Sequence, residues 1–328
     1  MNDQDDTTAV AGNVVTQSRI VAEKTNDHPT IGLALGAGAA RGWTHIGVIE
    51  RLEEAGIVPS VVAGTSIGAL IGGCYAADLL GELKEFALTL TRRHMFSFLD
   101  ISWGGSGLIS GDRLSSLLDD HMGEMQFTDM RVPFICIATE LLTGHEIWLR
   151  EGPVVSAMRG SYALPGVFRP AHRDGKWLID GAVVNPIPVS ACRAMGARLV
   201  IAINLNSDAF GGTVIQQGLA DDRPRKRQTR ESSSKSKPSM LRQMIGSNDD
   251  PGLTTVLVAA FNISQDRLAR SRLAGDPPDI NIMPRTPDIG LFEFDKAQEA
   301  IDAGREAVDR SLPDIEYALE VLERVSEI

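Results

Sequence analysis

The sequence predicts a three-layer α/β/α fold around a mostly parallel central sheet. Two strand–turn–helix units follow one another between residues 30 and 80, which is the order that builds a parallel sheet covered by helices. Several apolar runs, such as LVIAINL at residues 199–205, lack a polar alternation. Uninterrupted runs of this kind are typical of strands buried on both faces, so helices are expected on both sides of the sheet.

The elements are predicted from their hydrophobic periodicity and from turn residues. The first unit has a strand at residues 30–35, a glycine-rich turn, and a helix that ends near Gly56. The second has a strand at residues 57–63 and a helix at residues 67–80. Further strands are expected at residues 132–139, 146–150, 176–180, 199–205 and 279–283, and further helices at residues 153–161, 188–196, 253–273, 295–310 and 314–325.

Composition divides the chain into four parts. Residues 1–29 are polar and aperiodic and are expected to be a disordered leader. Residues 30–205 contain the strand–helix units and form the predicted catalytic core. Residues 206–252 are rich in Gly, Ser, Gln, Asp and Arg and are expected to be a flexible basic and polar insertion. Residues 253–328 are expected to complete the same domain with helices and a last strand.

Charge and cysteine usage limit the classes of function. Asp and Glu number 43 against 32 Lys and Arg, and this net charge of −11 argues against a nucleic-acid partner. The three cysteines show no CxxC spacing, which fits a reducing compartment and indicates no metal cluster. The acidic N-terminus lacks the pattern of a secretory signal. A cytoplasmic protein without a metal or cofactor is expected, and the oligomeric state is left open.

One local charge run departs from this balance. Arg223 to Lys237, RPRKRQTRESSSKSK, is strongly basic and contains one acid. We expect a solvated flexible insertion; the alternative is a peripheral contact with the anionic inner face of a membrane. No aromatic residue interleaves with the charges, which disfavours nucleic-acid binding.

The strongest chemical motif is a GxSxG sequence at residues 64–68. Strand-like residues precede it and a helical segment follows, which is the context of a nucleophile elbow. Such a turn exposes the serine oxygen beside the positive end of the next helix. Ser66 is therefore the candidate nucleophile, with a small packing residue as the alternative. The elbow is formed by Gly64, Thr65, Ile67 and Gly68.

A nucleophilic serine needs donors for an oxyanion, and the glycine-rich turn is the natural source. The predicted oxyanion loop contains Gly36, Ala37, Gly38, Ala39, Arg41 and Gly42. The competing interpretation is a dinucleotide fingerprint, but Arg41 occupies the third glycine position and the only suitably spaced acids fall within the helix. A phosphate-binding P-loop is excluded because no GK[ST] follows.

The general base is predicted to be an aspartate. No histidine follows residue 172, although a Ser–Asp–His chain order would place one late in the sequence. Asp180, followed by Gly181, ends a predicted strand, and active sites of open parallel sheets collect at such ends. The alternatives are a turn-capping role for Asp180 and a histidine base, with His172 and His45 as the residues to test.

Together the motifs resemble the patatin-like phospholipase family. The resemblance rests on GAGAARGWTHIGV at residues 36–48, GTSIG at 64–68 and DGAVVNPIP at 180–188, in that order. The segment 161–170, SYALPGVFRP, is also similar to the stretch that this family places before its DG motif. The resemblance covers about residues 30–205, and residues 290–304 look like the bacterial branch.

This resemblance implies a patatin-like fold and a Ser–Asp dyad in which Ser66 is the nucleophile and Asp180 its base. It also implies that the glycine-rich turn is the oxyanion loop, where Ala37 replaces a glycine of the usual pattern. The implied activity is hydrolysis of carboxylic esters of lipids or phospholipids, of the phospholipase A or lysophospholipase type. The alternatives are a thioesterase or general carboxylesterase with the same site, and a non-catalytic lipid-binding or scaffold protein.

An apolar segment at residues 94–109 is the candidate rim for an acyl chain. Its apolar side chains are followed by Gly104, Gly105 and Gly107, which would give it mobility, and ordinary core packing is the alternative. The predicted rim residues are Phe96, Phe98, Leu99 and Trp103.

Overall fold

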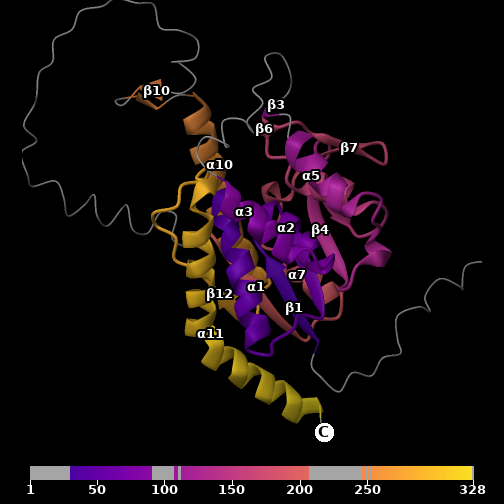
Figure 1. The fold of residues 1–328 in the computed structure, drawn as a ribbon, viewed down its shortest axis with the longest axis vertical. Coiled ribbons are helices and arrows are strands. Elements are labelled where there is room, and N and C mark those ends of the chain that lie inside the picture. The colour runs from indigo at the N-terminus through magenta and orange to yellow at the C-terminus, as the bar shows by residue number, and fades with distance from the viewer. Residues whose placement is uncertain are drawn as a thin grey trace, which may run out of the picture.

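The protein has three layers, with one central sheet between two layers of helices (Figure 1), as the sequence predicted. The computed structural model describes residues 30–90, 107–109, 112–206, 246–247, 250–251 and 253–326. The predicted leader, the basic run and the acyl-chain rim lie outside these residues. Among the residues described, no helix combines the length and the apolar character needed to cross a bilayer.

The central sheet has eight strands within the described residues, and its first five are parallel. In spatial order they are β12 (Ile280–Ile282), β9 (Leu199–Ile203), β1 (Ile31–Leu35), β2 (Val61–Thr65), β4 (Phe134–Glu140), β8 (Lys176–Asp180) and β7 (Ala171–Arg173), with β5 (Glu146–Leu149) also paired to β4. Two small pairs lie apart: β3 (Gly107–Ile109) with β6 (Gly166–Phe168), and β10 (Gly246–Ser247) with β11 (Asp250–Pro251).

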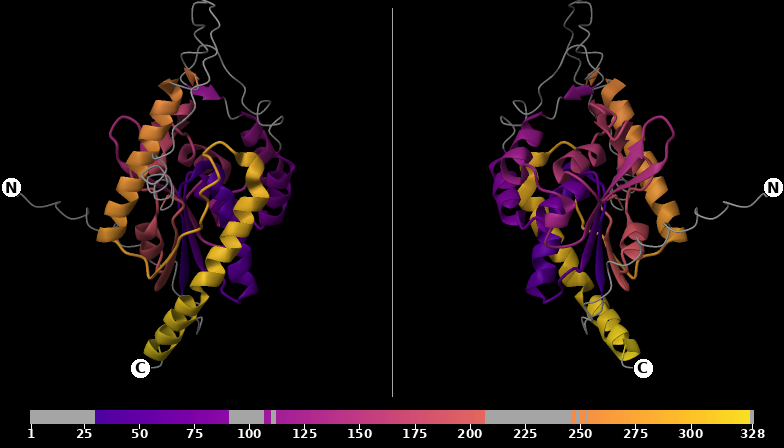
Figure 2. Two further views of the ribbon diagram at one scale, coloured as in Figure 1. Left: turned by 90° about the vertical axis from the view of Figure 1, so that its left-hand side faces the viewer. Right: turned by 90° about the vertical axis from the view of Figure 1, so that its right-hand side faces the viewer.

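Helices cover both faces of the sheet, and the two faces bury separate apolar clusters. The helices are α1 (Thr44–Glu54), α2 (Ile67–Ala76), α3 (Leu80–Thr89), α5 (Asp112–Met122), α6 (Val154–Ser161), α7 (Val189–Ala194), α10 (Leu253–Gly275) and α11 (Ala297–Ser326). Short 3-10 turns are η1 (Ala39–Trp43), η2 (Phe127–Asp129), η3 (Gly181–Val183) and η4 (Phe294–Lys296). Helices α1, α2, α6 and α11 contribute to the larger cluster, and α7 and α10 to the smaller. Figure 2 shows α10 and α11 on opposite sides of the sheet.

Strands β2 and β8 lie along the same edge of β4 and run toward each other. Ile137 of β4 pairs with β2 on one side and with β5 on the other, and Ala138 pairs with β5 and with β8. Because a strand has two edges, β8 must continue the line of β2 from the opposite direction. The C-terminal ends of both strands therefore meet at the middle of β4.

The strand that carries Asp180 runs in the opposite direction from the one predicted. The sequence interpretation assumed a parallel strand whose C-terminal end lies at the common edge. Strand β8 is instead antiparallel to β4, with Ala138 opposite Asp180. Asp180 still reaches the edge where β2 ends, because β8 starts beyond that edge and runs back toward it.

Two predicted helix boundaries were wrong. Helix α2 ends at Ala76 and not at residue 80, because Asp78 adopts a left-handed conformation (φ 62°) and the Leu79 N–H caps the Cys74 carbonyl at 2.8 Å.

The two predicted C-terminal helices form one continuous helix, α11, with Pro313 inside it. Proline removes one backbone hydrogen bond, but Val308 and Ile315 on either side of it are both fully buried. Packing of this shared apolar face keeps the helix continuous.

Candidate active site

Ser66 occupies the turn between β2 and α2, as the GxSxG motif predicted. Its backbone has φ 58° and ψ −123°, a left-handed φ that is rare outside glycine. The residue is the N-cap of α2, so its hydroxyl lies beside the positive end of that helix. A tight turn of this kind projects the hydroxyl away from the backbone and leaves it partly exposed.

The Ser66 hydroxyl donates a hydrogen bond of 2.6 Å from Oγ to Oδ2 of Asp180. The second carboxylate oxygen, Oδ1, accepts from the Ala182 N–H at 2.8 Å, which fixes the orientation of the carboxylate. The Asp180 backbone is held as well, since its carbonyl accepts from the Thr139 hydroxyl at 2.9 Å. The structure thus brings the two predicted residues together in the geometry of a nucleophile and its base.

Asp180 is almost completely buried, with 1% of its surface exposed. Burial raises the pKa of the Asp180 carboxyl to about 7, and the hydrogen bonds from Ser66 and Ala182 oppose this shift only in part. No cation pairs with the carboxylate among the hydrogen bonds and ion pairs of the described residues. A carboxylate of this basicity can exchange a proton with a serine hydroxyl near neutral pH.

Ser161 is hydrogen-bonded to the backbone of the candidate nucleophile Ser66, and the sequence interpretation gave it no role. Its buried hydroxyl accepts from the Ser66 N–H at 3.0 Å and donates to the Ile137 carbonyl at 2.5 Å. The strained backbone of Ser66 is thereby tied to the central strand β4. The only sequence signal was the position of Ser161 at the start of the SYALPGVFRP segment.

The two alternative histidine bases are engaged elsewhere. His45 is fully buried, its Nε2 lies 2.8 Å from the Gly36 carbonyl, and desolvation lowers the pKa of its imidazole to about 4. His172 lies in β7, not in a turn, and packs against Trp177 with ring centroids 4.8 Å apart. The neutral ring of His45 therefore supports the glycine-rich loop, and neither side chain is placed as the base of Ser66.

The predicted oxyanion loop follows β1, and several of its N–H groups already have acceptors. The N–H of Gly36 donates to Ile203 and that of Ala37 to Pro186, at 3.2 and 3.0 Å. The Arg41 N–H donates to the Gly38 carbonyl at 3.2 Å. Gly38 and Ala39 have no acceptor for their N–H groups within the described residues, so the set of available donors is smaller than the sequence suggested.

The loop carries its strained backbone at Ala39. Ala37 replaces a glycine of the usual family pattern, yet the left-handed residue is Ala39, with φ 50°. An alanine in this region costs about 1 kcal/mol relative to its preferred conformations. The short turn η1 follows the loop, and helix α1 begins after it at Thr44.

The loop and the elbow interlock through two glycines. A Cβ at Gly42 would lie 2.2 Å from Cγ1 of Ile67, and a Cβ at Gly68 would lie 2.2 Å from the Leu35 carbonyl oxygen. Each motif therefore needs a glycine at the place where the other one packs against it. A larger residue at either position would push the loop and the elbow apart.

Arg41 lies beneath the loop with 5% of its surface exposed. Its guanidinium donates to Oδ1 of Asn206 at 3.4 Å, and the Asn206 side-chain amide donates to the Ala37 carbonyl at 3.4 Å. Burial lowers the pKa of Arg41, and its Nε has no hydrogen-bond partner in the part of the chain that the structure describes. Asn206, which the sequence interpretation did not select, thus links Arg41 to the backbone of the loop.

Comparison with known proteins adds the family. The family model described as patatin-like phospholipase matches residues 33–193. An uncharacterized NTE family protein of Mycobacterium tuberculosis is 33% identical over 330 residues, which cover 87% of this chain and 91% of that protein. The chain belongs to the patatin-like phospholipase family.

Other relatives of this patatin-like chain share part of their length with it. Lysophospholipase NTE1 of Saccharomyces cerevisiae is 31% identical over 182 residues, which cover 54% of this chain and 11% of that enzyme. The crystal structure of VipD from Legionella pneumophila superposes with a TM-score of 0.51 and 13% identity, over 88% of this chain and 67% of that one. At this identity the VipD comparison concerns the fold alone.

We predict that Ser161→Ala weakens the nucleophile of this patatin-like chain. The Ser66 N–H would lose its acceptor, so its turn would relax from the conformation that presents the hydroxyl. The expected result is an approximately 10-fold lower rate of Ser66 modification by a fluorophosphonate, as is typical for a lost buried hydrogen bond. The measurement is the inactivation rate at several probe concentrations, with the melting temperature recorded in parallel.

Ser311→Ala is the matched control, because the Ser311 hydroxyl also donates to a backbone carbonyl, that of Ala307, at 3.0 Å. It should leave the inactivation rate unchanged. If Ser161→Ala lowers the melting temperature but not the rate, Ser161 has a structural role only.

Proposed function

We propose that this chain is a serine lipid acyl hydrolase that cleaves carboxylic esters of lipids or phospholipids through a Ser66–Asp180 dyad. The observation that carries the proposal is the 2.6 Å hydrogen bond from Ser66 to a buried carboxylate. Membership of the patatin-like phospholipase family and similarity to lysophospholipases support the substrate class.

In the first half of the reaction, Ser66 Oγ attacks the ester carbonyl while its proton moves to Oδ2 of Asp180. The carbonyl oxygen becomes an oxyanion, for which the N–H groups of Gly38 and Ala39 are the proposed donors. The tetrahedral intermediate then collapses. Asp180 gives the proton to the leaving alcohol, and the acyl group stays on Ser66 as an ester.

In the second half, a water molecule takes the place of the alcohol. Asp180 accepts a proton from the water as the resulting hydroxide attacks the acyl carbonyl. Collapse of the second intermediate breaks the bond to Ser66 Oγ, which recovers its proton from Asp180. The products are the free carboxylic acid and the original dyad.

A thioesterase or a general carboxylesterase would use the same residues, because the chemistry at Ser66 does not depend on the leaving group. Assays with three substrates distinguish these activities. The substrates are a lysophospholipid, an acyl thioester and a short soluble ester. A non-catalytic lipid-binding protein of the same fold would turn over none of them.

The first prediction from this proposal concerns the nucleophile. A fluorophosphonate probe should modify Ser66 in the folded protein, because the dyad activates this hydroxyl. Mass spectrometry of the digested protein identifies the modified peptide, and Ser66→Ala should abolish the labelling. Modification of a different residue would contradict the proposal. So would the absence of labelling in a folded sample. Folding is checked by the melting temperature, which should be the same in the parent and in Ser66→Ala.

The second prediction concerns pH. The base must be deprotonated, so the activity should fall as the pH drops through about 7, where the Asp180 carboxyl titrates. Asp180→Asn should lose at least about 100-fold in turnover and lose this inflection. The measurement is the pH profile of kcat/KM on a soluble ester, which avoids changes in lipid packing. Full activity in Asp180→Asn would exclude the aspartate base.

The third prediction concerns how the stability of the folded protein depends on pH through the Asp180 carboxyl. Burial raises the pKa of the folded Asp180 carboxyl above its ordinary value of 3.8, so the folded state binds the proton more tightly than the unfolded state does. The parent protein therefore loses stability from this group as the pH rises from about 4 to about 7. Asp180→Asn lacks this loss, so its melting temperature relative to the parent should be higher at pH 8 than at pH 5.

A further inference from the structure

Exposed apolar side chains lie on one side of the site, at the turn between β4 and β5 and on the neighbouring strand β8. Leu142 at the tip of the turn is 81% exposed, Leu141 is 46% exposed, and Trp177 on β8 is 47% exposed. Strand β4 ends at this turn, so the three side chains stand beyond the edge of the sheet that holds Ser66.

Two more exposed apolar side chains lie toward the other end of the same edge. Met283 follows the C-terminal end of β12 and is 48% exposed, and Phe292 is 41% exposed. Phe292 lies next to the predicted oxyanion loop, because the carbonyl of its neighbour Leu291 accepts from the Ala40 N–H at 3.0 Å. We call Leu141, Leu142, Trp177, Met283 and Phe292 the apolar edge set.

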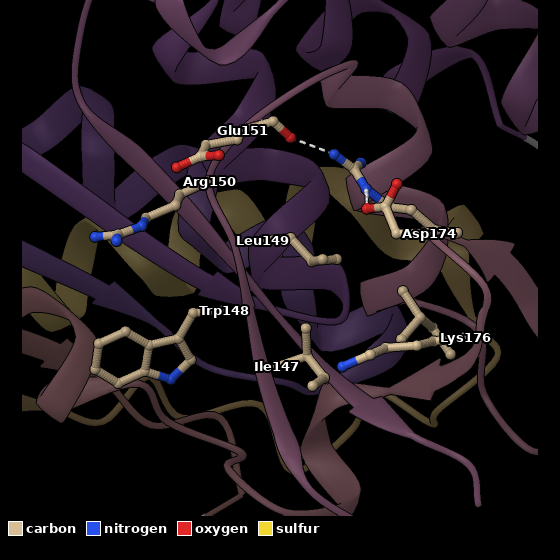
Figure 3. Close-up of a pocket in the computed structure, with 9 residues that line it drawn as sticks. Ile147, Trp148, Leu149, Arg150, Glu151, Asp174 and Lys176 are labelled. Carbon is tan, nitrogen blue, oxygen red and sulfur yellow. Dashed lines mark hydrogen bonds and ion pairs between the residues drawn. The ribbon is translucent and has the colours of Figure 1, made fainter. Parts of the chain in front are cut away.

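The turn that carries the leucines is held firmly in the fold. The Leu141 N–H donates to the Trp177 carbonyl at 2.8 Å, and the Trp177 ring packs against His172. Next to the turn of the β7–β8 hairpin, Arg173 donates to the carbonyls of Pro153 and Glu151. A groove of about 290 Å³ is lined by β5 and by residues of the hairpin. Figure 3 shows the side chains that line it. Leu141 and Trp177 are therefore presented by an ordered framework.

The rise per residue along β4 gives the distance between Leu141 and the Ser66–Asp180 pair. Ala138 lies opposite Asp180, and Leu141 is three residues further along the chain. At about 3.3 Å per residue, Leu141 stands roughly 10 Å beyond the dyad along the strand direction. A lipid ester must cover this distance from any aggregate to Ser66, and moving its acyl chain through water costs free energy for every exposed methylene.

We propose that the apolar edge set is the surface by which this chain docks on a phospholipid bilayer, which delivers the lipid ester directly to Ser66. This inference rests on the proposed function. The side chains would enter the interfacial region of the bilayer, while the acyl chain of the substrate passes between them instead of through water.

Charge on the turn and hairpin indicates which kind of bilayer fits. Residues 140–151 and 169–178 contain four acids and four Lys or Arg residues: Glu140, Glu146, Glu151, Asp174, Arg150, Arg169, Arg173 and Lys176. This balance gives no attraction to an anionic surface. The apolar edge set therefore binds through insertion, and a zwitterionic phosphatidylcholine bilayer suffices.

The distribution of the side chains favours a bilayer over a protein partner. They occupy separate segments at β4–β5, β8, β12 and the loop before η4. A protein interface needs a contiguous area of about 800 Å² per partner. A bilayer accepts separate side chains, because each one inserts on its own.

The test uses the full chain with Ser66→Ala, so that vesicles stay intact during the measurement. Cosedimentation with phosphatidylcholine vesicles should be reduced about 10-fold by Leu142→Gln, since a leucine side chain leaves the apolar phase. Leu142→Gln combined with Phe292→Gln should reduce it further. The vesicles contain phosphatidylcholine alone, so that any binding of anionic lipid by the basic run Arg223 to Lys237 does not contribute.

Val58→Gln and Tyr317→Gln are the matched controls. Both parent residues are exposed apolar side chains, at 50% and 68%, but Val58 precedes β2 at the opposite edge of the sheet and Tyr317 lies on α11. They should leave vesicle binding unchanged. Equal losses in the controls, or full binding by the Leu142 and Phe292 variants, would overturn the proposal.

Activity separates this inference from the proposed function. With Ser66 restored, Leu142→Gln should hydrolyse a short soluble ester at the parent rate and a vesicle-bound ester about 10-fold more slowly. If the parent protein hydrolyses none of the esters, the proposed function is contradicted. The vesicle-binding result would still stand, because it is measured without turnover. A concentration-dependent dimer that Leu142→Gln abolishes, without vesicle binding, would assign the surface to a second copy of the chain instead.

Discussion

The site depends on the hydrogen bond between Ser66 and Asp180, and the sheet topology makes that bond possible. Strands β2 and β8 approach each other along one edge of β4 and end opposite Ile137 and Ala138. A hydroxyl and a carboxylate from residues 114 positions apart thus come within 2.6 Å without a loop having to carry either one. Both ends are tied to β4, through Ser161 to Ile137 and through Thr139 to Asp180.

The same bond requires two unfavourable features, which the surrounding structure holds in place. Ser66 keeps a left-handed backbone, and Asp180 keeps its carboxylate away from water. Such features persist where neighbouring contacts over-determine them. Here the Ser161 hydroxyl holds the first and the Ala182 N–H the second. Burial also raises the pKa of the Asp180 carboxyl to about 7. The same burial therefore lowers the stability of the fold when the carboxylate is charged and makes that carboxylate basic enough to accept a proton.

Local patterns in the sequence were sufficient for the parts of the site made by adjacent residues. The strand–turn–helix units, the elbow at Ser66 and the selection of Asp180 follow from periodicity, glycine placement and the late absence of histidine. The direction of β8 could not be predicted, because antiparallel pairing with β4 is set by contacts distant in sequence. Ser161 and Asn206 were missed for the same reason: a serine and an asparagine carry no sign of the carbonyl or N–H that they will meet.

The predicted oxyanion loop shows how tertiary contacts distinguish residues that look equivalent in sequence. Six residues were candidate donors, but backbone carbonyls from the ends of other segments occupy the N–H groups of Gly36 and Ala37. Those bonds anchor the loop to β9 and to Pro186, and they leave the next two N–H groups without acceptors within the described residues. Anchoring thus falls on Gly36 and Ala37, and the strained alanine, Ala39, is one of the two residues proposed as donors. A substitution at Ala37 would consequently change the position of the loop, whereas one at Ala39 would change the conformation of a proposed donor.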